Sequence, residues 1–145
     1  MNHRQAYLNL RDRHQQELSD FPIAYAFNKQ QLEEALKKLG AKKEECVTIA
    51  GCGDVMKKTD VPAFRDMMKR HKEELHEALK DPEFAEAAFL YEMDNHEYAI
   101  NWSGDEDVLD CFNLTWKKLS EMGLEMAWDS ARNKHMKHAQ EWDMI

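Results

Sequence analysis

Residues 92–98 contain side chains that serve in acid–base catalysis and in metal binding. His96 and Glu97 are adjacent, Asn95 precedes them, and Glu92 lies four residues before His96. An imidazole with a carboxylate partner is the usual base of hydrolytic enzymes, and the carboxylate orients the ring. The segment therefore supports the hypothesis of a small metal-dependent or acid/base enzyme centred on His96 and Glu97.

One combination of histidines and carboxylates has the spacing of metal ligands. Glu92 and His96 are four residues apart, and His135 and His138 are three residues apart. Pairs with these spacings share one face of a helix, and carboxylate oxygens and imidazole nitrogens are zinc ligands. The four residues form a metal site only if the last helix crosses the chain at residue 96.

Other patterns give no support for a cofactor, and we expect none. The three cysteines do not have the paired spacing of a zinc site, and no Gly-x-Ser-x-Gly elbow occurs. Neighbouring residues on a strand point to opposite faces. His96 and Glu97 can therefore act as base and orienting group only if the fold happens to bring them together. A protein without catalytic activity is therefore expected more than an enzyme.

The strongest compositional feature is an acidic segment without a basic residue. Ten Asp and Glu and no Lys or Arg lie between Asp81 and Trp116, which leaves 18 acidic residues against 20 basic ones elsewhere. This surplus disfavours direct nucleic-acid binding and favours docking onto a basic protein surface; a solvated face kept for solubility is the alternative. The predicted binding residues are Glu86, Asp94, Asp105, Glu106, Asp107 and Asp110.

Length and composition predict one globular domain over residues 1–145. The chain is 43% hydrophobic with a net charge of −8, and no apolar run approaches the roughly 18 residues of a membrane span. It opens with a charged, amphipathic stretch in place of a signal peptide. Together with an odd number of cysteines, these features predict a cytoplasmic protein that contacts no membrane.

Hydrophobic periodicity predicts an α+β fold with five or six helices packed on one face of a small antiparallel sheet. The sheet is expected from a hairpin over 46–58, whose turn contains Gly51 and Gly53, and a strand over 97–102 that alternates apolar and polar residues. Apolar stripes and capping residues predict the main helices over 1–20, 29–39, 61–80, 83–94, 103–112 and 124–142. Thr115 is expected to cap a further helical turn through Met122.

Several stretches within residues 21–112 carry a resemblance to a known family. They are "FPIAYAFNKQQLEEALKKLG" (21–40), "KKTD" (57–60), "RH" (70–71) and above all "YEMDNHEYAI" (91–100). On these stretches the chain resembles a family of small uncharacterised proteins encoded by phages and mobile elements of gut-type Gram-positive bacteria. The resemblance implies an accessory role in the host cytoplasm and brings no activity or active site.

The leading hypothesis is a non-enzymatic protein-binding module whose acidic surface docks a basic surface of a host or mobile-element protein. An inhibitor of a host nucleic-acid-handling or defence protein fits it, because such targets have basic channels. The enzyme centred on His96 and Glu97 is the alternative, and it requires His96 to be open to a substrate. A homo-oligomer assembled through the C-terminal helix, with Trp128 and Trp142, is a third hypothesis.

Overall fold

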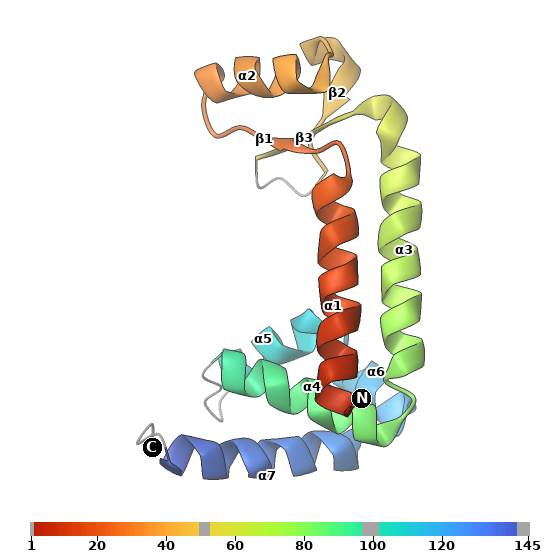
Figure 1. Ribbon diagram of the computed structural model, residues 1–145, viewed down its shortest axis with the longest axis vertical. Coiled ribbons are helices and arrows are strands. Elements are labelled where there is room, and N and C mark those ends of the chain that lie inside the picture. Colours follow the sequence, from red (N-terminus) through yellow and green to blue (C-terminus); the bar gives the residue numbers. More distant parts are fainter. Residues whose placement is uncertain (1, 50–52, 97–101, 142–145) are drawn as a thin grey trace. The chain divides into compact units, whose positions relative to one another are not determined.

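The computed structural model describes residues 2–49, 53–96 and 102–141 (Figure 1). The chain divides into two compact units: unit 1 comprises residues 1–12 and 72–145, and unit 2 comprises residues 13–71. The boundaries fall within α1 (His3–Asp20) and α3 (Val61–Ala78). Charge divides in the same way, since unit 1 has 19 acidic against 9 basic residues and unit 2 has 9 against 11.

Unit 2 contains a three-stranded antiparallel sheet with the order β1-β3-β2. Its strands are β1 (Ala24–Tyr25), β2 (Cys46–Val47) and β3 (Asp54–Lys57). β2 and β3 pair in antiparallel register, which confirms the hairpin predicted over 46–58. Short 3-10 helices, Lys43–Glu45 and Lys58–Asp60, precede β2 and follow β3.

Helix α2 (Lys29–Leu39) packs on this sheet in unit 2. The Asn28 side chain accepts a hydrogen bond from the main chain at its third residue, at 2.8 Å, which satisfies a free N–H of the first turn. Gly40 ends the helix in the left-handed conformation, with φ of 64°. Ala35 and Leu39 contribute the buried face that lies against the strands.

Two stacked histidines join α1 and α3 within unit 2. The ring centroids of His14 and His71 are 4.0 Å apart, and Nε2 of His71 lies 3.4 Å from Oε2 of Glu17. Glu17 also accepts hydrogen bonds from Arg70, which lower the pKa of its carboxyl to about 2. Burial, with a smaller contribution from the His14 ring, lowers the pKa of His71.

Acid is expected to destabilise unit 2 through His71. The folded pKa lies below the unfolded value of about 6.5, so the unfolded chain takes up a proton first as the pH falls. The contribution of His71 to stability is thus present above about pH 6.5 and is lost below it. Melting temperatures at about pH 7.5 and about pH 5.5 measure this loss, which should be smaller in His71→Gln. His3→Gln in unit 1 is the control, and equal losses in both variants would contradict the prediction.

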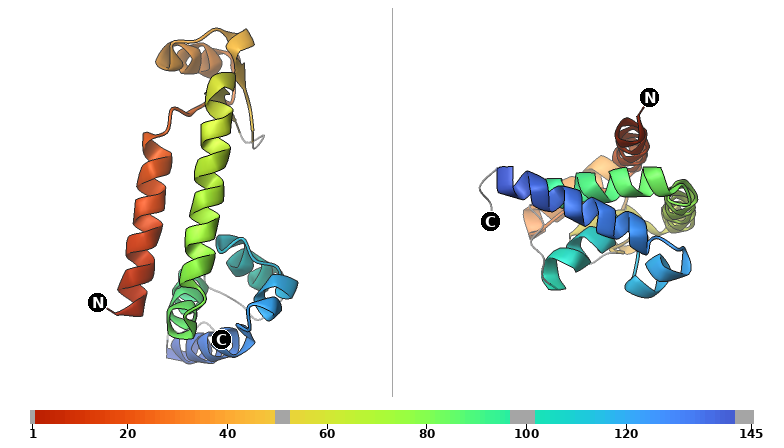
Figure 2. Two further views of the ribbon diagram at one scale, coloured as in Figure 1. Left: turned by 90° about the vertical axis from the view of Figure 1, so that its right-hand side faces the viewer. Right: turned by 90° about the horizontal axis from the view of Figure 1, so that it is seen from below.

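The described residues of unit 1 form helices joined by short connections, and none of them lies in a strand. Unit 1 contains α4 (Pro82–Asn95), α5 (Trp102–Cys111), α6 (Trp116–Glu121) and α7 (Glu125–Glu141), together with the adjoining parts of α1 and α3. Helices α4 and α7 pack along each other (Figure 2).

An aromatic cluster forms the centre of the unit 1 core. The ring of Phe89 lies 5.0 Å from that of Phe112 and 5.2 Å from that of Trp128, and Tyr7 from α1 lies 5.6 Å from Phe112. These edge-on and tilted arrangements are the favourable ones for aromatic pairs. Trp128 is 3% exposed, so it packs inside unit 1 and does not offer an apolar surface to a partner.

The observed elements confirm the α+β class and correct its details. The described residues form seven α-helices, not five or six. Asn113, with φ of 52°, interrupts the chain after α5, and Thr115 caps the expected helical turn, which counts as the separate helix α6. Of the strand predicted over 97–102, residues 97–101 lie outside the described residues, and Trp102 begins α5. The third strand of the described sheet is β1, which pairs with β3.

The helices also do not all pack on the sheet. The buried cluster of unit 1 is built from helices and their connections and has no strand residue, whereas α2 shares the cluster of the strands in unit 2. None of the described helices is both long and apolar enough to cross a membrane.

Candidate metal centre

Three side chains of unit 1 that are known metal-ligand types converge at one point. Glu92 lies on the last turn of α4, and His96 is four residues later at its C-cap, so both face the same side. Cys111 is the last residue of α5. Nε2 of His96 lies 3.2 Å from Oε2 of Glu92 and 3.4 Å from Sγ of Cys111, and all three atoms lie within 4.8 Å of one another.

The second oxygen of Glu92 is held by residues of α1. The Tyr7 hydroxyl donates a hydrogen bond to Oε1 at 3.1 Å, and Nε of Arg11 lies 3.6 Å from the same oxygen. Glu92 is 1% exposed, whereas the side chain of His96 is 40% exposed. The cluster is therefore anchored in the core and open to solvent on the side of His96.

The hydrogens of this cluster stay on the thiol and the phenol. Burial raises the pKa of Cys111 to about 12, and the neighbouring charge of Glu92 adds to the effect. Burial and Glu92 raise the pKa of Tyr7 as well. Without a cation, Cys111 is a neutral thiol, and its single hydrogen is donated to the main-chain oxygen of Asp107 at 3.3 Å. It is not an activated nucleophile.

Of the predicted catalytic residues, the structure brings Glu92 and His96 together. The ring of His96 faces Glu92 and Cys111, and its side chain is not buried against a main-chain carbonyl of any described residue. Asn95 is exposed at the end of α4 and lines a pocket beside α7. Glu97 lies outside the described residues.

The histidines of α7 contact a different carboxylate. Nδ1 of His135 lies 2.6 Å from Oδ1 of Asp94, and Nδ1 of His138 lies 2.9 Å from Oδ2. His135 is completely buried and His138 is partly exposed. One carboxylate thus holds two imidazoles and ties α7 to α4. The residues that accompany Glu92 and His96 are Cys111, Tyr7 and Arg11.

Replacing Asp94 with Asn is expected to lower the free energy of unfolding of unit 1 by about 1–3 kcal/mol. The neutral amide accepts from one imidazole only, which leaves the buried ring of His135 or that of His138 with a poorer partner. Urea unfolding followed by tryptophan fluorescence measures the change. Asp110→Asn removes the same charge from an exposed position of α5 and should stay within about 0.5 kcal/mol of the parent protein. Equal effects of the two substitutions would refute the role assigned to Asp94.

The acidic segment divides into residues that hold the fold and residues on the surface. Glu86 accepts hydrogen bonds from Ser130 and from Lys134, and these bonds lower the pKa of its carboxyl. Asp94 binds the two histidines of α7. On α5 the side chain of Asp105 is half-buried, and the exposed ones are Glu106, Asp107 and Asp110.

Sequence reasoning missed Cys111, Tyr7 and Arg11. Tyr7 and Arg11 are four residues apart, so the helical period places them on one face of α1. The spacing in the sequence is enough to infer that they share this face. Nothing in the sequence relates this face to Glu92, which is 85 residues from Tyr7. Cys111 follows His96 by 15 residues across a separate helix, and no spacing rule covers such a pair.

Comparison with known proteins gives one match. A protein-family model with the description "Family of unknown function (DUF7659)" matches residues 6–134, a range that includes the whole candidate metal centre. Searches of the curated proteins and of the solved structures returned no match. The match confirms the expectation of an uncharacterised family, whereas a phage or mobile-element origin stays a prediction.

Proposed function

Because the chain belongs to a family of unknown function (DUF7659), we propose a function from its own geometry: it binds a divalent transition-metal ion, zinc in the first place, through Glu92, His96 and Cys111. Thiolate, imidazole and carboxylate are all ligands that zinc accepts. Soft thiolate and imidazole ligands disfavour Mg²⁺ and Ca²⁺, which prefer oxygen.

The observation that carries this proposal is the spacing of the three ligand atoms. Zn–S and Zn–N bonds of about 2.3 and 2.0–2.1 Å at tetrahedral angles place sulfur about 3.5 Å from nitrogen, and nitrogen about 3.3 Å from a carboxylate oxygen. The separations are 3.4 Å from Cys111 to His96 and 3.2 Å from His96 to Glu92. Two of the three separations thus already match those that such an ion requires, and the third, between Cys111 and Glu92, is within 4.8 Å.

A covalent mechanism fits the same residues less well. In a nucleophile–base–orienter arrangement, the two ring nitrogens of the histidine face different partners. Here Nε2 of His96 faces both Glu92 and Cys111. Three electronegative atoms that point to one place are typical of ligands around a cation.

The surroundings of Glu92 support a metal centre that remains open to small molecules. Tyr7 and Arg11 bind Oε1 and leave Oε2 directed at the other two ligands, as outer residues do in metal sites. Three protein ligands leave one of four positions for water or a substrate, as in catalytic zinc sites. The exposed side of His96 is where that position would be reached, which favours the metal-dependent form of the enzyme hypothesis.

Metal content and cobalt spectroscopy test the proposal. Protein purified without a polyhistidine tag is expected to contain about one zinc per chain, or to take it up after removal of metal with a chelator. Cobalt(II) added to the metal-free protein should produce a near-ultraviolet thiolate-to-cobalt band and the visible absorption of a tetrahedral ion. Absence of both stoichiometric metal and the thiolate band would refute the proposal.

The acidic surface supports a second candidate function, a protein-binding module. Unit 1 has ten more acidic than basic residues, and Glu106, Asp107 and Asp110 are exposed on α5. Such a surface attracts a basic partner and repels nucleic acid. In this interpretation the protein is a phage or mobile-element accessory protein that acts in the host cytoplasm, as an inhibitor of a host nucleic-acid-handling or defence protein.

Charge reversal on α5 tests this second candidate. Affinity capture from a lysate of a gut Gram-positive bacterium should recover basic proteins that elute with salt. Replacing Glu106, Asp107 and Asp110 together with Lys is expected to abolish their capture. A triple reversal at exposed acids of unit 2, Glu33, Glu34 and Glu44, is the matched control. Recovery of the same basic proteins by the α5 variant would rule out docking through α5.

A further inference from the structure

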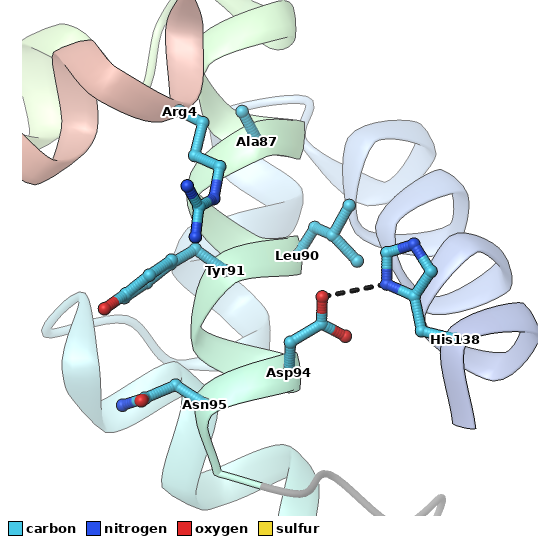
Figure 3. Close-up of a pocket in the computed structure, with 7 residues that line it drawn as sticks. All are labelled: Arg4, Ala87, Leu90, Tyr91, Asp94, Asn95 and His138. Carbon is cyan, nitrogen blue, oxygen red and sulfur yellow. Dashed lines mark hydrogen bonds and ion pairs between the residues drawn. The ribbon is translucent and has the colours of Figure 1, made fainter. Parts of the chain in front are cut away.

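We propose that a pocket beside α1, α4 and α7, separate from the metal centre, binds a small organic anion whose acidic group pairs with Arg4 and whose apolar body lies on Leu90 and Tyr91. All residues that line the pocket belong to unit 1, and Figure 3 shows them from three helices around one hollow. Its volume of about 440 Å³ is in the range of small-molecule sites.

The floor of the pocket is an apolar stretch of α4. Leu90 and Tyr91 are adjacent on the helix, and Asp94 and Asn95 follow them one turn later, so the four side chains lie along one side of α4. Leu90 and the face of Tyr91 offer carbon surface, and the next turn offers polar groups (Figure 3). This combination of an apolar floor and a few directed polar groups is typical of ligand sites.

The guanidinium of Arg4 is placed to receive an anion. Its central carbon lies 5.2 Å from the centroid of the Tyr91 ring, and Figure 3 shows the group above that ring. Stacking on the ring orients the guanidinium without using its five N–H donors. No described residue accepts a hydrogen bond from it, nor does one bind the carboxamide of Asn95. A carboxylate or phosphate at this position would find donors already oriented.

Among the described residues that line the pocket, the one carboxylate does not oppose an anion strongly. Asp94 contacts imidazole nitrogens through both oxygens, with His135 on one and His138 on the other. Both of its oxygens are therefore already engaged by side chains of α7. The guanidinium of Arg4 offers only donors and the carboxamide of Asn95 adds an NH2 group, so the hollow is locally suited to negative charge.

The surrounding charge limits the size of that anion. Unit 1 has a surplus of ten acidic residues, so a polyanion such as nucleic acid meets repulsion over most of the surface. A molecule small enough to stay within the pocket is screened from most of those charges, because screening acts over about 8 Å at physiological ionic strength. The expected ligand is therefore a single acidic group on a compact apolar or aromatic body.

A titration followed by ¹H–¹⁵N NMR tests the pocket, with phenyl phosphate as the probe. Saturable shifts are expected on α4 around Leu90 to Asn95 and at His138. Inorganic phosphate lacks the apolar body and phenol lacks the charge, so each should bind at least about tenfold more weakly. Arg4→Gln should raise the dissociation constant of phenyl phosphate about tenfold or more, because a hydrogen-bonded charge pair is lost.

Two controls make the outcome decisive. Arg65→Gln removes an exposed arginine of unit 2 and should leave the dissociation constant unchanged. Cys111→Ser removes a proposed metal ligand, and it should leave the binding of phenyl phosphate unchanged because the two sites share no residue. Absence of saturable shifts, equal binding of phenol, or an unchanged constant in Arg4→Gln would each overturn the proposal.

Discussion

Replacing Cys111 with Ser is expected to weaken zinc binding by about a hundredfold or more and to abolish the thiolate-to-cobalt absorption band. A serine hydroxyl keeps its proton near neutral pH and is a poor ligand, whereas a metal ion deprotonates the thiol as it binds. Loss of a ligand should exceed the 10- to 100-fold effect of losing an outer residue. Isothermal titration of the metal-free protein with zinc measures the affinity.

Two further variants separate the metal centre from a general effect on thiols. Cys46→Ser removes a half-buried thiol of unit 2 and should leave zinc binding unchanged. Tyr7→Phe deletes only the hydroxyl that holds Oε1 of Glu92, so it should weaken binding by about tenfold. Zinc affinity that is the same in Cys111→Ser as in the parent protein would eliminate Cys111 as a ligand.

Replacing Phe112 with Ala is expected to lower the free energy of unfolding of unit 1 by about 3–5 kcal/mol. Phe112 is completely buried, and its ring contacts those of Phe89 and Tyr7, so truncation removes apolar contact and leaves a cavity. All four tryptophans belong to unit 1, so tryptophan fluorescence in urea follows this unit selectively.

A phenylalanine in unit 2 provides the control for this experiment. Phe27 is 75% exposed, and Phe27→Ala should change the tryptophan-detected transition by less than about 0.5 kcal/mol. If Phe112→Ala shifts that transition no more than Phe27→Ala, the core of unit 1 does not depend on the aromatic cluster as described.

The helices could be predicted from the sequence because their signals are local. Asn28 and Gly40 bound α2 as expected, and Thr115 caps α6 by accepting a hydrogen bond from the main chain of Lys118 at 3.1 Å. The sheet was harder to predict. A strand of two residues, Ala24–Tyr25, is too short to show alternation, and its place is set by pairing with β3. Trp102 fits an alternating pattern in sequence but begins a helix.

The candidate site could be predicted only as far as local spacing allows. Glu92 and His96 were identified as a pair because a helix brings residues four apart together. Cys111, Tyr7 and Arg11 join them through the packing of α1, α4 and α5, which depends on buried contacts between distant segments. The same packing directs His135 and His138 to Asp94.

The division of unit 1 into two segments has a consequence for the order in which the protein folds. Unit 2 is one continuous stretch of chain, whereas Tyr7 and Arg11 are synthesised long before Glu92 and Cys111. Contacts over such separations form late, and segments completed early fold first during synthesis. The first turns of α1 therefore wait for α4 and α5, and the cluster around Glu92 closes only after Cys111 has been made. An ion that binds there stabilises these late contacts, so metal occupancy would report whether a newly made chain has formed them.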